Sequence, residues 1–354
     1  MKMTRRFLWS IPILAILISA CSVVSSSVPR SLHPTGKYAI SPQFNFAGTF
    51  VNGLAAVDTK TGWGFINKSG KYVIAPDLGF AGDFVQGIDL SPAFKGGSLL
   101  WGYIDLKGKF QISQKFRMAG NFSEGLAPAG DGKLYGFIDR SGTYVIPLQF
   151  DGADNFSGGF AAVKVGQKYG FVDTSGKYLV NPKFDGAGRF LDGLAAVEDG
   201  TKWGFIDTRG KYVIEPRFKY ITGGGPCCEF AGGFADGLAA VSNDGPNWGY
   251  IDKSGKFVIE PQPRLGDDFV NGLIVVNNGT TSSFMDKKGK YAIRTHYKYA
   301  RHFVNGFAPV GNGTKWGYID RSGKTIISPR FDTAGDFVEG LAAVAIGTKW
   351  GYIS

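Results

Sequence analysis

The sequence predicts an all-β fold made of nine repeats of about 34 residues, each a three-stranded antiparallel meander. Three observations support this: an aromatic-Gly pair returns at a fixed spacing, a turn with Gly follows it, and a strand-like segment ending in Pro follows the turn. The 354-residue chain contains 53 Gly and 14% aromatic residues, as expected for short strands joined by tight turns. We expect the repeats to form a closed, propeller-like ring, with an open β-solenoid as the alternative.

Two landmarks locate every repeat. The first is Phe-x-x-Gly before an apolar run, at Phe50, Phe84, Phe122, Phe156, Phe190, Phe234, Phe269, Phe303 and Phe337. The second is the aromatic-Gly pair that begins at Trp63, Trp101, Tyr135, Tyr169, Trp203, Trp248, Trp316 and Trp350. In the remaining copy, Ser282 and Ser283 replace the pair. Successive pairs lie 34 residues apart wherever no insertion intervenes, so the repeat is a structural unit.

Residues 194–216 illustrate the strands of one repeat. An apolar run over 194–197 is the first strand, and the alternating segment 202–207 is the second. A turn follows, and 211–214 is the third strand, which Pro216 ends because proline cannot donate to a ladder. We expect the segment after Phe218 to be a crossover to the next repeat.

The repeated glycines and aromatic residues have structural explanations. In Asp-x-Ser-Gly-Lys, the Asp can cap backbone amides while the Gly adopts a positive φ. The Gly after Trp allows a close backbone approach. We expect the Trp rings to be buried, because a three-stranded unit cannot bury its aromatic face unless neighbouring units stack on it.

The complete pattern, Trp-Gly-Phe/Tyr-Ile-Asp-x-x-Gly-Lys-aromatic-x-Ile-x-Pro-x-Phe, closely resembles the WG (KWG) repeat family of bacterial proteins. The resemblance covers residues 36–354 and departs from the pattern at Ser282-Ser283, Tyr135 and Tyr169. It implies a β-rich repeat array, often on bacterial envelope proteins. It implies no established catalytic residues.

The two ends of the repeat region complement each other. Residues 36–40 read as a third strand without a first or second, and 350–354 read as a second strand without a third. Pairing of the two segments would complete one unit and remove exposed sheet edges. The points within the repeat at which the region begins and ends therefore favour the ring over the solenoid.

The N-terminal 35 residues read as export and anchoring segments. Residues 1–20 combine a basic start with an apolar run too short for a typical membrane-spanning helix, which indicates a signal peptide. The run ends in Ile-Ser-Ala before Cys21, which resembles a bacterial lipobox and predicts lipidation of Cys21. Residues 21–35 are rich in Ser and Pro and predict a flexible tether to the β domain at 36–354. The chain is therefore expected in the bacterial envelope, held to the membrane only by lipid.

Two irregular features are candidate sites. Cys227 and Cys228 are adjacent in the largest insertion and could form a vicinal disulfide in an oxidising compartment, remain free thiols, or link to a partner. The second feature is a basic segment beside the copy that lost its Trp-Gly. Its candidate anion-binding residues are Arg294, His296, Tyr297, Lys298, Tyr299, Arg301 and His302. A solvated crossover loop is the alternative for this segment.

The sequence predicts no metal site, no cofactor and no nucleic-acid partner. No cluster of His and Cys has zinc-ligand spacing, and no catalytic nucleophile or phosphate-loop motif occurs. The Lys that follows each turn Gly is mostly balanced by the Asp that begins the same turn. We therefore expect a non-enzymatic envelope scaffold that binds a protein or a cell-surface glycan. The alternatives are a periplasmic hydrolase, which needs acids converging in a central channel, and a multivalent lectin, which needs exposed Trp rings.

Overall fold

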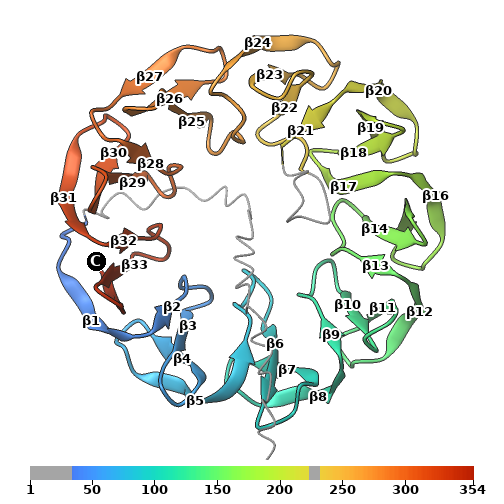
Figure 1. Cartoon of the computed structure of the whole chain (residues 1–354). Helices are drawn as coiled ribbons and strands as arrows, with labels where there is room; N and C mark the ends of the chain where they lie inside the picture. The colour runs from blue at the N-terminus through green and yellow to red at the C-terminus, as the bar shows by residue number, and fades with distance from the viewer. Residues whose placement is uncertain (1–33, 223–231) are drawn as a thin grey trace, which may run out of the picture.

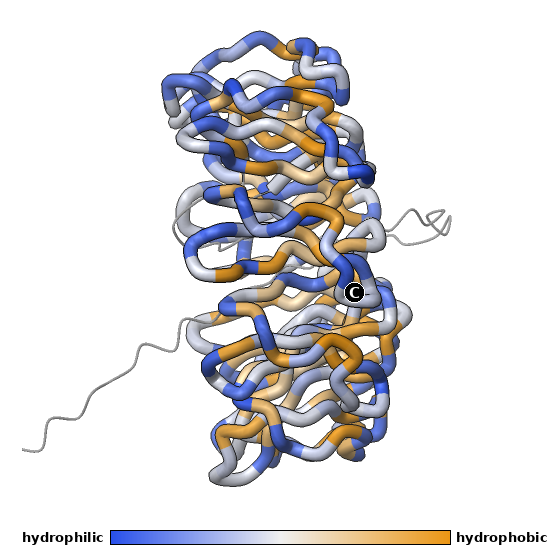
Figure 2. The backbone as a smooth tube through the Cα atoms, turned by 90° about the vertical axis from the view of Figure 1, so that its right-hand side faces the viewer, coloured by the Kyte–Doolittle hydropathy of each residue, from blue (hydrophilic) through white to orange (hydrophobic). Residues whose placement is uncertain are grey.

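The computed structural model describes residues 34–222 and 232–354, and every regular element in these ranges is a β-strand. Consecutive strands pair antiparallel into sheets that follow one another around a ring (Figure 1). Seen from the side, the ring is a flat body in which hydrophilic and hydrophobic stretches of the chain are interspersed (Figure 2). We number the units 1 to 9 in chain order, so that unit 1 contains Trp63 and unit 9 contains Trp350.

The three predicted strands recur in every described unit. Because a short inner strand precedes them in most units, we now call them the second, third and outer strands, and Figure 1 shows the outer strand on the outside of the ring. The second strands are β3 (Leu54–Asp58), β6 (Leu90–Lys95), β10 (Ala127–Gly130), β14 (Phe160–Val165), β18 (Leu194–Asp199), β22 (Ala239–Ser242), β25 (Leu273–Asn277), β29 (Phe307–Gly311) and β33 (Ala342–Ile346). The third strands are β4 (Trp63–Asn67), β7 (Trp101–Asp105), β11 (Tyr135–Ile138), β15 (Lys168–Asp173), β19 (Lys202–Asp207), β23 (Asn247–Ile251), β26 (Ser282–Asp286), β30 (Trp316–Asp320) and β34 (Lys349–Ile353). The outer strands are β5 (Tyr72–Ala81), β8 (Phe110–Phe116), β12 (Tyr144–Phe150), β16 (Tyr178–Phe184), β20 (Tyr212–Phe218), β24 (Phe257–Pro263), β27 (Tyr291–Arg294), β31 (Thr325–Phe331) and β1 (Tyr38–Phe44).

The predicted crossover is itself a strand in most units. It supplies a short inner strand that pairs with the second strand and makes a four-stranded sheet. These inner strands are β2 (Phe46–Ala47), β9 (Met118–Ala119), β13 (Gly152–Ala153), β17 (Gly186–Leu191), β21 (Tyr220–Ile221), β28 (Tyr299–Ala300) and β32 (Thr333–Ala334). In unit 2, the end of the long strand β5 takes this role by pairing with β6, which joins units 1 and 2 into one seven-stranded sheet. The prediction of three strands per unit was therefore one short for most units.

The predicted pairing of the two ends of the repeat region is confirmed. β1 pairs antiparallel with β34, with Tyr38 opposite Ile353 and Ile40 opposite Tyr352, and thereby becomes the outer strand of unit 9. The backbone amide of Thr35 also donates to the carbonyl of Ser354 at 2.8 Å. The first and last described strands therefore belong to one sheet.

The Gly after Trp is explained by an approach of the outer strand. A Cβ on Gly204 would lie 2.5 Å from the carbonyl oxygen of Ile214 and 2.7 Å from the nitrogen of Pro216. The ladder between β19 and β20 is irregular at this point, because the outer strand bulges toward the third strand before its Pro. In unit 7, where Thr295 replaces the Pro, Ser283 pairs in regular register with Arg294 and its Cβ is tolerated.

Burial of the repeated aromatic residues is less complete than the sequence predicts. Trp203 is 9% exposed and Tyr169 is 7% exposed. The other six positions are half-buried, namely Trp63, Trp101, Tyr135, Trp248, Trp316 and Trp350. These rings lie where the third strand begins, at the edge of the sheet, so the next unit covers only part of each. The fully buried aromatic residues come instead from the position two residues later, as in Phe205, from the Phe-x-x-Gly landmark, as in Phe156, and from the Phe that ends several outer strands, as in Phe150.

Two faces of the ring follow from the antiparallel order. The turn face carries the Asp-x-x-Gly turns between third and outer strands, as well as the tight turns that precede each second strand. The hairpin face carries the hairpins between second and third strands. On the turn face, Asp207 caps its turn as predicted, with Oδ1 accepting the amides of Arg209 at 2.9 Å and Lys211 at 3.1 Å.

Side chains of the turn face also tie neighbouring units together. The carboxylate of Asp192 in unit 5 accepts the amide of Gly237 in unit 6 at 2.8 Å. The carboxylate of Glu339 in unit 9 accepts the amide of Gly53 in unit 1 at 3.1 Å and pairs with Lys68 at 3.0 Å. The junction between the chain ends is therefore made like the junctions inside the chain.

Replacing Tyr352 with Phe is expected to lower the free energy of unfolding by about 0.5–1.5 kcal/mol, because it removes one buried hydrogen bond. The Tyr352 hydroxyl donates to the Gly48 carbonyl at 2.8 Å and so joins unit 9 to unit 1. Tyr103 makes the same bond to Gly120 at 2.8 Å between units 2 and 3, so Tyr103→Phe is the matched control. Denaturant unfolding should give similar losses for both variants. A loss for Tyr352→Phe several times that of the control would contradict the equivalence of the two junctions.

Candidate functional site

The predicted basic segment is divided among three locations. Arg294 lies at the end of the outer strand β27, exposed, with its guanidinium 4.4 Å above the ring of Tyr291. His296 is also exposed and packs against Tyr297, with ring centroids 4.2 Å apart. Tyr297 is only 5% exposed, and its hydroxyl lies 2.7 Å from Oγ1 of Thr325. Tyr297 is thus a core residue rather than a binding residue.

A second group from this segment stacks on the hairpin face. The ring of Tyr299 lies parallel to that of Trp316 at 6.3 Å. The ammonium of Lys298 lies 5.3 Å from the Tyr299 ring, and the guanidinium of Arg301 lies 5.1 Å from the Trp316 ring. Tyr299 remains 42% exposed. Cations over aromatic faces are stabilising, and this stack presents one open ring to solvent.

The third location is the inner side of the ring, where His302 meets acidic residues. Its Nε2 lies 3.2 Å from Oδ2 of Asp267, which comes from the preceding unit. Its Nδ1 is buried and has no hydrogen-bond partner among the described residues. We call Asp267, Asp268, Arg301, His302 and Asp336 the inner ionisable group. The group contains three carboxylates beside its two basic residues, so it does not form the free cationic patch that an anion site requires.

The inner ionisable group has shifted protonation equilibria. Burial alone lowers the pKa of His302, but the hydrogen bond to Asp267 and the charges of the three aspartates raise it above the ordinary value of 6.5. Burial raises the pKa of Asp268, although the Thr222 hydroxyl donates to its Oδ1 at 2.6 Å. Burial also raises the pKa of Asp336, which lies near Arg301 and His302. Carboxyl groups of this kind can hold a proton closer to neutral pH than exposed ones.

Sequence reasoning missed the aspartates of this group. Asp268, His302 and Asp336 all occupy the position directly before the repeated Phe, and Asp83 occupies it in unit 2. Burial raises the pKa of Asp83 to about 6. The sequence contained one signal for these residues: ionisable side chains recur directly before the Phe of the Phe-x-x-Gly landmark. These residues are far apart in the chain, so only the ring brings Asp267, His302 and Asp336 together.

The imidazole of His302 is expected to titrate above pH 6.5, and Asp267→Asn should lower its midpoint because the hydrogen-bonded charge is lost. The sign for stability follows from the raised pKa. The pairing of His302 with Asp267 contributes fully to the free energy of unfolding below the unfolded-state pKa of about 6.5. This contribution is lost as pH rises through the folded-state pKa. A histidine-selective NMR titration measures the midpoint. Asp89→Asn, which removes a carboxylate paired with Arg140 in another unit, is the control. An unchanged midpoint in Asp267→Asn would contradict the pairing.

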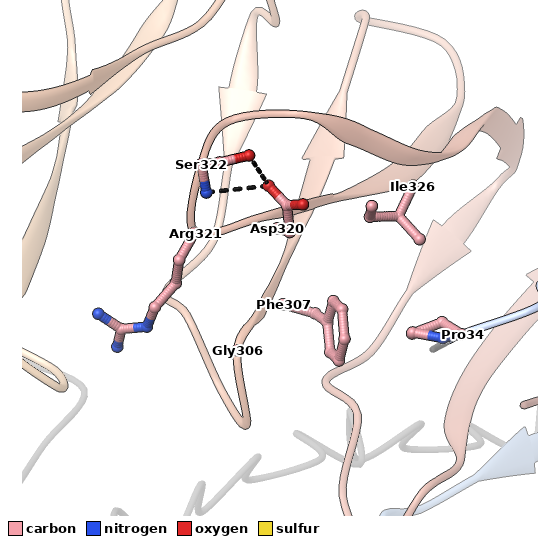
Figure 3. A pocket seen from close by; sticks show the side chains of 7 residues that line it. All are labelled: Pro34, Gly306, Phe307, Asp320, Arg321, Ser322 and Ile326. Atoms are coloured by element: carbon pink, nitrogen blue, oxygen red, sulfur yellow. Dashed lines mark hydrogen bonds between the residues drawn. The ribbon is translucent and has the colours of Figure 1, made fainter. Parts of the chain in front are cut away.

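The described residues also line two shallow depressions beside the chain junction. One has a volume of about 370 Å³ and is lined by Pro34, Gly306, Phe307, Asp320, Arg321, Ser322 and Ile326 (Figure 3). Its polar groups are engaged within the chain: Oδ1 of Asp320 accepts the amide and hydroxyl of Ser322, and Arg321 donates to the Asn271 carbonyl at 3.1 Å. The other depression includes Lys37, Tyr38 and Arg330. Neither places converging reactive groups around a ligand.

Other predicted features lie outside the described residues. Cys21, Cys227 and Cys228 all fall in the segments 1–33 and 223–231. Within the described ranges, no group of three or more His, Cys, Asp or Glu side chains is arranged to hold a metal ion. None of the regular elements between residues 34 and 222 or between 232 and 354 is an apolar helix of membrane-spanning length.

Solved structures with similar folds include three that cover most of this chain. A structure described as the eukaryotic initiation factor superposes with a TM-score of 0.56 at 14% identity, over 83% of this chain and 89% of that chain. BamB from Moraxella catarrhalis gives a TM-score of 0.43 at 11% identity, over 89% and 99%. AztD from Citrobacter koseri gives 0.42 at 14% identity, over 87% and 98%. At such identities the likeness concerns the fold alone. No curated protein matches the chain.

The repeat itself has a family match. A family model described as WG containing repeat matches residues 32–59, 63–97, 101–133, 135–169, 169–203, 203–223, 248–279, 283–316 and 316–350. The matched segments include unit 7, which lacks the Trp-Gly pair, and leave out residues 224–247, which contain the insertion and the strand β22. Because the matches cover most of the chain, this protein belongs to the family built from the WG containing repeat.

Proposed function

We propose that this chain is a non-enzymatic scaffold of the bacterial cell envelope, anchored through lipid on Cys21, that binds an envelope protein or glycan. The observation that carries the proposal is that the repeated residues are engaged in holding the ring together. The Gly after Trp accommodates the outer strand, the Asp caps its turn, and the repeated Phe packs between units, as Phe337 does against Tyr318 at 4.8 Å. Residues that differ between units are therefore the candidates for binding a partner.

The position of the first described residues supports an oriented scaffold. Thr35 donates to Ser354 at the turn face, so the predicted tether leaves the ring on that side. An anchored ring would turn its hairpin face away from the membrane. The exposed stack of Tyr299, Trp316 and Arg301 lies on that hairpin face. A partner in the envelope would reach this face without competing with the membrane surface.

Lipid anchoring is tested by labelling cells with radioactive palmitate and separating membrane from soluble fractions. The wild-type chain should carry label and sediment with membranes, whereas Cys21→Ser should lose the label and appear in the soluble exported fraction. Cys227→Ser is the matched control, because it removes another cysteine and should keep the label. Equal labelling of wild type and Cys21→Ser, or retention of Cys21→Ser on membranes, would contradict the anchor.

A hydrolase is the second candidate function, and one observation favours it. The inner ionisable group places Asp268 and Asp336, both with raised pKa, on the inner side of the ring beside His302. Glycoside hydrolysis uses two carboxyl groups on either side of the scissile bond, one of which is an acid with a raised pKa. Fluorogenic N-acetylglucosaminide substrates test this candidate. Activity at mildly acidic pH that disappears in Asp336→Asn would favour the hydrolase over the scaffold.

A further inference from the structure

The hairpin face carries a continuous row of aromatic side chains along one arc of the ring. The row begins at Trp350 in unit 9, whose ring centroid lies 5.9 Å from that of Phe46. The centroid of Phe46 lies 5.5 Å from that of Trp63, and both of these residues belong to unit 1. The row continues to Phe80 at 5.1 Å and to Trp101 at 5.6 Å in unit 2. Phe94 adds a sixth ring, 5.1 Å from Trp101 and 6.4 Å from Phe80. We call these six residues the aromatic row.

Packing does not require the phenylalanines of this row. Phe46 and Phe80 stand in the inner-strand position that Gly152 and Gly186 occupy in units 4 and 5. In unit 5 the Trp203 ring lies directly over Gly186, whose added Cβ would come within 2.7 Å of it, and Trp203 becomes buried. The fold is therefore complete with Gly at this position.

Phe94 is also unusual for its position. It occupies the last part of the second strand, where the corresponding residues in other units are Asp58, Gly130, Lys164 and Glu198. Phe46 and Phe80 thus stand where units 4 and 5 have Gly, although units 3, 6 and 8 have Met118, Tyr220 and Tyr299 there. Phe94 replaces a small or polar residue, and it joins Phe80 and Trp101 into one cluster. All six rings of the row remain half-buried rather than sealed in the core. Beside them, Leu99 at the tip of the unit 2 hairpin is 80% exposed.

The surroundings of the row are polar and carry few charges. Beside Phe46, the ammonium of Lys349 is held by Oδ1 of Asn45 at 2.7 Å. Beside Phe94, Lys95 pairs with Asp77 at 2.5 Å. Asp77 balances the charge of Lys95, whereas Lys349 keeps its positive charge because Asn45 is neutral. Beside Trp63, the hydroxyls of Thr59 and Thr61 provide hydrogen-bonding groups at the edge of the row.

We infer that the aromatic row binds a linear N-acetylated glycan, namely the glycan strand of peptidoglycan. The inference rests on the proposed envelope location, where this polymer is abundant. Sugar rings present C–H groups on their faces, which pack on the electron-rich faces of aromatic rings, and acetamido methyl groups add apolar contact. A row that runs across three units matches a chain of successive sugars better than it matches a single small ligand. The hairpin-face position leaves the row accessible when the turn face is tethered.

The test uses the full exported chain carrying Cys21→Ser, so that no detergent competes for apolar surface. Chitohexaose, which is neutral, and peptide-free peptidoglycan glycan strands, which carry one lactyl carboxylate per disaccharide, are titrated while intrinsic Trp fluorescence and calorimetric heat are followed; muropeptides are titrated for comparison. Both probes should bind, and the double substitution Phe46→Gly with Phe80→Gly should weaken binding at least about tenfold, equivalent to 1.4 kcal/mol. Gly already occupies this position in units 4 and 5, so the variant should fold, and circular dichroism and its unfolding midpoint verify this.

Tyr220→Gly is the matched control, because it removes an exposed aromatic residue at the same inner-strand position in unit 6, outside the row. It should bind the glycans as wild type does. The inference is overturned if wild type binds neither probe, if the double variant binds equally well, or if Tyr220→Gly weakens binding as much. Binding only of muropeptides through their peptide stems would also overturn it and would indicate a peptide ligand. Each of these results leaves the palmitate experiment on Cys21 unaffected, so the two proposals can fail separately.

Discussion

Replacing Phe205 with Ala is expected to lower the free energy of unfolding by about 3–5 kcal/mol, the largest single-residue effect we predict. Phe205 has no exposed surface and packs edge-to-face on Phe234 of the next unit, with centroids 4.9 Å apart. Its loss would leave a cavity between two sheets that the paired backbones cannot close. Denaturant unfolding followed by tryptophan fluorescence measures the change.

Val213→Ala is the control for this prediction. Val213 lies on the neighbouring outer strand β20 but is 44% exposed, so its truncation should change stability by no more than about 0.5 kcal/mol. A loss of less than about 1 kcal/mol in Phe205→Ala would show that the units do not depend on contacts between sheets. The repeat would then need another explanation than mutual packing.

Replacing Gly351 with Ala is expected to displace β1 from β34 and to lower stability by about 1–3 kcal/mol. The new Cβ would lie 2.5 Å from the carbonyl oxygen of Ile40 and 2.6 Å from the nitrogen of Pro42. In this unit, the opposing strand comes from the other end of the chain, so no hairpin holds it in place. Amide hydrogen exchange in residues 38–44 should therefore become faster.

Two controls separate the clash from its location. Gly204→Ala introduces a similar clash against Ile214, but there a turn connects the two strands, so exchange should stay slow in residues 38–44. Gly97→Ala adds a Cβ with nothing within 4 Å and should leave the protein unchanged. If Gly351→Ala left exchange in β1 unaltered, the pairing of the chain ends would contribute little to the fold.

The sequence predicts the repeated strands well because almost every unit has the same pattern of residues. The spacing from Trp203 through Gly210 to Pro216 defines two strands and their turn, and the structure places β19 and β20 there. The inner strand escaped prediction because its residues share no hydropathy. Phe46, Met118 and Gly152 all begin one, and their pairing is made by backbone atoms.

The candidate sites were harder to predict because their members come from different units. Tyr297 reads as part of a basic aromatic segment, but it stands where Phe218 stands in unit 5 and is buried like it. His302 reads as a free cation until the ring brings Asp267 beside it. The aromatic row escaped notice because Phe46 or Phe80, read alone, looks like another core residue. Only comparison with Gly152 and Gly186 shows that the fold does not need an aromatic side chain at this position.

The adjacency of Thr35 and Ser354 has a consequence for how such genes can change. Since the ends of the folded domain lie within hydrogen-bonding distance, a short linker could join them, and new ends could be opened at the hairpin Thr59–Gly62. A circularly permuted chain of this kind should reach the same architecture, because no unit is privileged as the first. Loss or duplication of one unit is a different matter, since the strand from the N-terminus must still meet the last sheet. The number of repeats is thus constrained by geometry, whereas the unit at which the chain begins and ends can change.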